Sequence, residues 1–77
     1  MNTVTKAVEI KDVQFIGNSA MILFLSNETS FIVPLDKFSS ISKLTSDEKK
    51  DFEVIDGNNL SFLALDEIYD LHDLTGI

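Results

Sequence analysis

The sequence has no cysteine, no arginine and no tryptophan, and it has only one proline and three glycines among 77 residues. Without cysteine the chain can form no disulfide, no thiolate zinc site and no cysteine nucleophile. Without arginine it lacks the side chain that clamps phosphate and reads guanine edges, which disfavours nucleic-acid binding. A domain of this size buries only about 60% of its unfolded surface, so we expect association with a second chain to stabilise it.

Long apolar runs are also missing. No segment approaches the roughly 20 consecutive apolar residues of a membrane-spanning helix, and the first residues contain no apolar signal-peptide core. We therefore expect a cytoplasmic protein without membrane contact, folded as one domain over residues 1–77.

Charge of one sign dominates the last third of the chain. The net charge is -7, and residues 53–77 contain six carboxylates but neither lysine nor arginine. Such a segment repels phosphate backbones and anionic lipid and attracts basic protein surfaces. The charge pattern thus predicts a basic protein as the partner.

Three strands are predicted in the first half of the chain. Alternating apolar residues indicate a strand over residues 8–15, with a bulge at Lys11 and Asp12, where the alternation changes phase. Turn-forming residues separate it from an apolar strand over 20–25, and a third strand covers 29–33. These signals predict an antiparallel meander.

The second half combines helices and strands. A capping box that begins at Thr45 predicts a short helix over residues 46–51. A hairpin of strands 53–55 and 60–63 follows, and a terminal helix covers 66–74. We therefore predict an α+β fold in which one small antiparallel sheet of four to five strands packs against two or three short helices. The expected core contains Ile10, Phe15, Ile22, Phe24, Phe31, Val33, Phe38, Val54, Leu60, Phe62 and Ile68.

An acidic stripe is expected on the terminal helix, with Asp66 as its N-cap. At helical spacing Asp66, Asp70 and Asp73 fall within an arc of about 60°. We interpret these residues, together with Glu67, as a surface for a basic partner; the alternative is a solvated face without a partner. Three carboxylates on one straight helix face cannot surround an ion, so we expect no metal site.

The strand over residues 20–25 is apolar on both faces, so neither face suits contact with water. Short helices can cover only one face of a small sheet. We expect Met21, Leu23 and Leu25 to form an interface with a second copy or with another protein. The alternative is that the sheet curls and closes around this strand.

Catalytic signals are missing from the sequence. The single histidine, His72, accompanies no nucleophile motif, and there is no glycine-rich phosphate loop, so we expect neither an enzyme nor a cofactor. Lys37, Lys43, Lys49 and Lys50 alternate with carboxylates, which indicates a solvated, internally paired face. Two alternative functions remain: a nucleic-acid-associated regulator that acts through these lysines, and an enzyme or weak metal-binding protein.

Three segments resemble the bacterial domain-of-unknown-function family 2442. They are FIVPLDKF over residues 31–38, LTSDE over residues 44–48 and GNNLSFLALDE over residues 57–67. Phe62 stands where the family more often has tryptophan, and Leu63 where it usually has proline. The resemblance implies an α+β fold and, because members are often encoded beside another small protein or fused to a DNA-binding domain, an antitoxin-like or regulatory role. We therefore expect a non-catalytic protein-interaction module that presents its acidic C-terminal surface to a basic protein.

Overall fold

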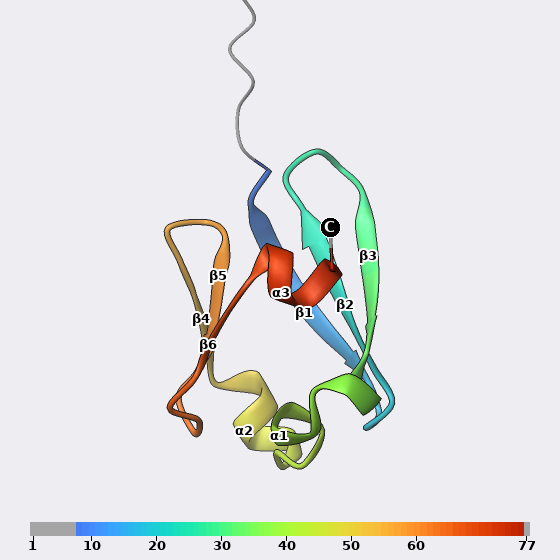
Figure 1. Ribbon diagram of the computed structural model, residues 1–77, viewed down its shortest axis with the longest axis vertical. Helices are drawn as coiled ribbons and strands as arrows, with labels where there is room; N and C mark the ends of the chain where they lie inside the picture. The colour runs from blue at the N-terminus through green and yellow to red at the C-terminus, as the bar shows by residue number, and fades with distance from the viewer. Residues whose placement is uncertain (1–7, 77) are drawn as a thin grey trace, which may run out of the picture.

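The computed structural model describes residues 8–76 and has an α+β fold with two small antiparallel sheets (Figure 1). Within these residues the two three-stranded sheets have the orders β1–β2–β3 and β4–β5–β6. The strands are β1 (Ile10–Ile16), β2 (Ala20–Leu25), β3 (Ser30–Pro34), β4 (Phe52–Ile55), β5 (Asn59–Phe62) and β6 (Ile68–Asp70). The helices are α1 (Ser39–Ser42), α2 (Ser46–Lys50) and α3 (Leu71–Thr75), and a 3₁₀ turn covers Leu35–Lys37.

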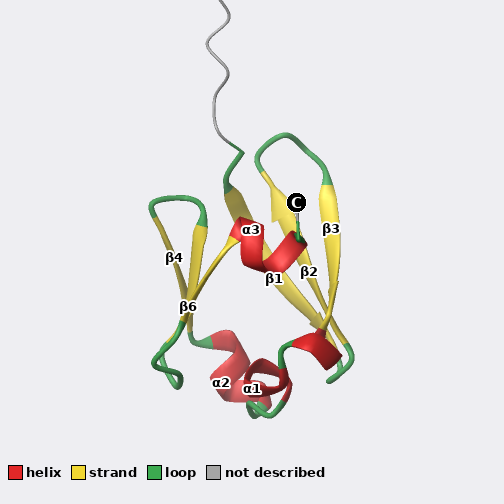
Figure 2. Cartoon of the chain, viewed as in Figure 1, coloured by secondary structure: helices red, strands yellow, loops and turns green. Residues whose placement is uncertain are grey.

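The predicted α+β class is confirmed, whereas the expectation of a single sheet with four to five strands is wrong. The helical segment between β3 and β4 carries the chain from one sheet to the other, so strands pair only within each unit. Figures 1 and 2 show the sheets on opposite sides of the molecule, with α1 and α2 at one end and α3 between the sheets. The inner faces of both sheets contribute to one apolar core.

A bulge near the start of β1 directs unevenly spaced side chains towards this core. The register between β1 and β2 shifts between Ile10 and Asp12, as the sequence predicts. Beside this irregularity the Asp12 carboxylate accepts a hydrogen bond of 2.8 Å from the Val13 amide. Ile10 and Val13, an odd number of positions apart, are consequently both buried, which regular strand alternation would not allow.

Strand β2 turns towards the core the side chains that the sequence assigns to an interface. Met21 and Leu23 are completely buried, at 0% exposure, and Leu25 packs against the same core. The prediction that this face binds another chain is therefore wrong for Met21 and Leu23. The physical reason is that both faces of β2 are apolar, so either face could be the buried one. In the structure the side chains at the odd-numbered positions of β2 join Leu60 and Phe62 of the second sheet in one buried cluster.

The even-numbered side chains of β2 lie on the outer face of the first sheet. Ile22 and Phe24 are partly buried but are not among the side chains that pack against the core. The predicted core positions of these two residues are wrong, as is that of Ile68, which is 58% exposed. Ile10, Val33, Leu60 and Phe62 are confirmed as buried, and Phe15, Phe31, Phe38 and Val54 pack against the core while partly buried. Buried hydrophobic residues that the prediction omits are Val13, Met21, Leu23, Leu35, Ile41, Leu44 and Leu74.

The helix ends differ in how well the sequence predicts them. The capping box of α2 is confirmed: Thr45 Oγ1 accepts a hydrogen bond of 3.1 Å from the Glu48 amide, and Glu48 Oε1 accepts one of 2.9 Å from the Thr45 amide. Helix α3 covers only Leu71–Thr75, because residues 68–70 form β6 and pair with β5. The ladder satisfies backbone groups that a longer helix would otherwise have paired internally.

Candidate functional site

The four carboxylates predicted to bind a partner do not share one helix face. Asp66 and Glu67 lie in the connection between β5 and β6, whereas Asp70 ends β6 and Asp73 belongs to α3. Asp66, Glu67 and Asp73 are exposed, and Asp70 is partly buried. The expected helical stripe with Asp66 as its cap is therefore wrong, because the helix begins only at Leu71.

Asp70 and Asp73 form a second capping box. Asp70 Oδ1 accepts a hydrogen bond of 2.7 Å from the Asp73 amide, and Asp73 Oδ2 accepts one of 3.3 Å from the Asp70 amide. At the other end of α3, Gly76 adopts the left-handed conformation with φ +75°, in agreement with its predicted position just beyond the helix. Both carboxylates thus satisfy amide groups at the start of α3 and have a structural role.

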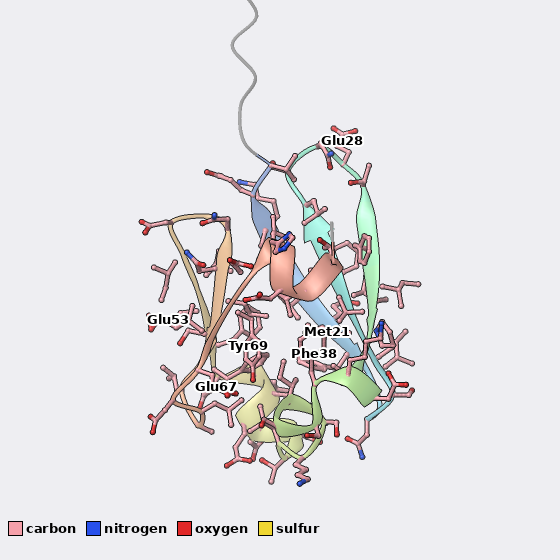
Figure 3. All side chains as sticks on the ribbon, in the orientation of Figure 1. Met21, Glu28, Phe38, Glu53, Glu67 and Tyr69 are labelled. Carbon is pink, nitrogen blue, oxygen red and sulfur yellow. The ribbon has the colours of Figure 1, made fainter. Side chains whose placement is uncertain are left out.

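Glu67 is fixed by the single tyrosine of the chain. The Tyr69 phenol donates a hydrogen bond of 2.6 Å to Glu67 Oε1, and its ring packs edge to face on Phe38 with centroids 5.8 Å apart. Burial, followed by the hydrogen bond and negative charge of Glu67, raises the pKa of Tyr69 to about 12, while Ser40 acts in the opposite direction. Figure 3 shows Tyr69 and Phe38 between the two sheets. One carboxylate of the acidic segment is therefore tied to the core.

The outer side of the β4–β5–β6 sheet combines carboxylates with exposed apolar side chains. Glu53, Ser61 and Ile68 are in register across the three strands, and Figure 3 shows Glu53 on the side away from the other sheet. Leu63 extends β5, since its amide donates a hydrogen bond of 3.0 Å to the Asp51 carbonyl, and strand alternation places it on the same side as Ser61. Leu63 is 65% exposed. We call the surface of Glu53, Leu63 and Ile68, together with the exposed carboxylates Asp66 and Glu67 of the adjoining β5–β6 connection, the acidic sheet face.

The outer side of the β1–β2–β3 sheet is apolar and uncharged over most of its area. Ile22 pairs with Ile32 on one side and with Gln14 on the other, and Ala20 pairs with Ile16 and with Pro34. The exposed fractions are 61% for Ile32 and 49% for Ile16. We call the surface of Ile16, Ala20, Ile22, Phe24, Ile32 and Pro34 the apolar sheet face. The sequence indicates that β2 has two apolar faces. The outer one carries the even-numbered residues of β2, whereas the sequence analysis assigns the interface to the odd-numbered residues.

The histidine and the lysines considered in the sequence analysis lie at separate places in the fold. His72 is exposed on α3, and within residues 8–76 no three or more His, Cys, Asp or Glu side chains are grouped so as to hold a metal ion. In the same part of the chain, no helix has the length and apolar character needed to cross a membrane. Lys37, Lys43 and Lys50 are exposed as predicted, whereas Lys49 is buried, which the sequence analysis missed.

Comparisons with models of known protein families, with curated proteins and with solved structures find no match for this chain. The resemblance to family 2442 therefore stays a prediction, and the function has to be inferred from the surfaces described above.

Proposed function

We propose that this protein is a non-catalytic interaction module that binds a basic protein through the acidic sheet face. The observation that carries the proposal is the position of two exposed apolar side chains, Leu63 and Ile68, on either side of a connection that contains Asp66 and Glu67. Single exposed apolar residues are common on soluble proteins. Apolar residues gathered at one site and rimmed by polar groups are more typical of a binding surface.

The charge pattern selects the class of partner. Residues 53–77 contain six carboxylates and no lysine or arginine, so no cation of the same segment neutralises them. Such a surface accelerates association with a basic protein and opposes approach to nucleic acid or anionic lipid. Covering the apolar side chains supplies the rest of the binding free energy, since full burial of a leucine or isoleucine contributes about 1.5–3 kcal/mol.

The resemblance to family 2442 suggests a more specific form of this function. In that form the partner is a small basic protein whose activity is masked, as an antitoxin masks its toxin. The hydrogen bond between Tyr69 and Glu67 supports a binding role, because a carboxylate already held in place loses less conformational entropy when a partner binds.

Affinity capture from the native host tests the proposal. The double variant Leu63→Ser/Ile68→Thr removes the apolar part of the acidic sheet face and leaves the buried core unchanged. The matched control is Ile32→Thr, because Ile32 is 61% exposed on the other sheet. We expect the wild type and the control to retain a basic protein in stoichiometric amount, and the double variant or high salt to release it. Recovery of no such protein, or equal retention by the double variant, would contradict the proposal.

Self-association is a second function, favoured by the apolar sheet face. The chain has a net charge of -7, so two copies repel each other least where they meet on an uncharged surface. The six residues of the apolar sheet face are uncharged, with the Asp12 carboxylate at its margin in register with Phe24, and sheets of this kind pack face to face about 10 Å apart. We propose that a homodimer forms by contact of this face with its counterpart in a second copy.

Analytical ultracentrifugation over a range of protein concentrations tests the homodimer. We expect the wild type to become dimeric as concentration rises, and Ile32→Lys to remain monomeric, because the substitution places a charge within the contact. Ile68→Lys, on the acidic sheet face, is the control and should dimerise like the wild type. A wild type that stays monomeric at every concentration would rule out this dimer.

A further inference from the structure

Lys49 occupies an environment that differs from that of a surface lysine. Its side chain is only 6% exposed although it lies in the last turn of α2, a helix with exposed polar neighbours. The Lys49 ammonium donates a hydrogen bond of 2.5 Å to Asn18 Oδ1, and it lies 5.7 Å from the centroid of the Phe15 ring. Among the residues that the structure describes, its recorded contacts are thus an amide oxygen and a ring face rather than a carboxylate.

Within residues 8–76, this positive charge forms a hydrogen bond with an amide oxygen and lies over a ring face, and no ion pair with a carboxylate is seen. An ammonium group has three hydrogen-bond donors, and the Asn18 amide oxygen accepts one of them. Burial of a charge is costly unless an opposite charge or several hydrogen bonds compensate for it. The site is therefore electrostatically complementary to an anion, in contrast to the acidic sheet face.

A pocket of about 390 Å³ adjoins this ammonium group, and Lys49, Asn18 and Phe15 all contribute to its wall. This volume falls within the roughly 300–1,000 Å³ of typical small-molecule sites. The remaining lining residues are Val13, Gln14, Gly17, Ser46, Lys50 and Phe52. The lining thus combines apolar side chains with amide, hydroxyl and ammonium groups.

The aromatic part of the wall is held in position by the core. Phe15 and Phe52 both pack on the fully buried Phe62, with ring centroids 6.1 Å and 6.2 Å apart. Because β1 and β4 each supply one of these rings, the two sheets jointly shape the pocket. A rigid apolar wall of this kind favours a flat apolar group, since little side-chain entropy is lost on binding.

We propose that this pocket binds a small organic anion, in which a carboxylate or similar group pairs with Lys49 and a flat apolar body lies against Phe15 and Phe52. Lys50 adds a second positive charge to the lining. A polyanion such as nucleic acid does not fit, because the net charge of -7 repels it and the buried ammonium is accessible only to a ligand small enough to enter. The site is independent of both sheet faces described above.

The proposal is tested by titrating the isotope-labelled full chain with benzoate and following its backbone amide resonances. Benzamide serves as the neutral analogue, and inorganic phosphate as an anion without an apolar body. We expect saturable shifts at Gly17, Asn18 and Phe52 with benzoate, and binding weaker by about tenfold or more for either comparison compound. The absence of saturable shifts with benzoate, equal binding of benzamide, or equal binding of phosphate would each overturn the proposal.

Asn18→Asp is the most informative variant, because it has nearly the same shape and gives Lys49 a carboxylate partner in place of the amide. We expect it to weaken benzoate binding by about tenfold or more. Asn27→Asp makes the same charge change in the exposed β2–β3 turn and should bind benzoate like the wild type. Lys49→Met provides a second variant that retains the apolar stem of the side chain. Unchanged benzoate binding by Asn18→Asp or by a folded Lys49→Met protein would show that Lys49 does not hold the anion.

Discussion

The Tyr69 phenol donates its hydrogen bond to a carboxylate only two residues earlier in the chain, Glu67 Oε1, across 2.6 Å. This contact joins the acidic connection between β5 and β6 to the aromatic core, because the Tyr69 ring also packs edge to face on Phe38. The donor must keep its proton to maintain the hydrogen bond. The protonation state of the Tyr69 phenol therefore reports whether this contact with Glu67 is formed.

The pH dependence of Tyr69 follows from its pKa, which burial and Glu67 raise to about 12. The unfolded chain titrates near the ordinary value of about 10, so the folded state holds this proton more tightly. The resulting stabilisation is complete below about pH 10 and is lost as the pH rises towards about 12. Because the chain has one tyrosine, its phenolate absorbance reports this residue alone. We expect the titration of Tyr69 in the folded protein to have its midpoint near pH 12, and that in Glu67→Gln to have a lower midpoint. A midpoint of about pH 10 for the folded wild type would contradict the contact between Tyr69 and Glu67.

Leu23 and Ile32 provide a comparison between the two faces of the first sheet. Leu23 has 0% exposure in the core, whereas Ile32 is 61% exposed on the apolar sheet face. We expect Leu23→Ala to lower the free energy of unfolding by about 2–5 kcal/mol, because it leaves a cavity. Ile32→Ala should change it by about 0.5 kcal/mol or less in the monomer. Urea denaturation at low protein concentration measures both values, and similar losses would mean that the faces are assigned incorrectly.

The capping box of α2 predicts a defined loss of stability. In Thr45→Ala the Glu48 amide loses its side-chain acceptor at the helix start. The expected cost is about 1 kcal/mol of unfolding free energy. Thr45→Ser retains a hydroxyl at the same position and is the control. Equal stability of the serine and alanine variants in urea denaturation would show that this hydrogen bond does not contribute.

Gly57 is predicted to tolerate a side chain less well than Gly17. Both have positive φ, +80° and +53°, so alanine at either site is strained by about 1–2 kcal/mol. At Gly57 a new Cβ would also lie 2.7 Å from Glu9 Cγ, whereas at Gly17 it would meet nothing within 4 Å. We therefore expect Gly57→Ala to be the more destabilising. Combining it with Glu9→Ala should remove the excess cost, and a double variant without recovery would exclude this clash as its cause.

Local signals in the sequence predict much of this fold. The phase change at Asp12 predicts the bulge, and Thr45 with Glu48 predicts the cap of α2, because each feature depends on side chains a few residues apart. Both hairpins are also predicted, since turn residues bound their strands. The separation into two sheets is not predicted by the sequence, because it depends on contacts between segments that are far apart in the chain.

The errors in the predicted sites have the same origin. Strand β2 is apolar at both parities, so its sequence does not reveal which face meets the core, and the choice of Met21 and Leu23 for an interface is wrong. The spacing of Asp70 and Asp73 is a cap signal that marks the start of α3, but the longer helical pattern conceals it. Lys49 alternates with carboxylates along the chain, and nothing local indicates that it turns towards Asn18, 31 residues away.

The connectivity of the two sheets also has a consequence for how the molecule folds. Every ladder joins strands that follow one another directly in the chain, and short turns close each hairpin. Forming either sheet therefore costs little loop-closure entropy, and such local topologies fold rapidly. We therefore expect the packing of the two sheets around Phe62 to be the slower event, and substitutions at this residue to retard refolding more than substitutions within either turn.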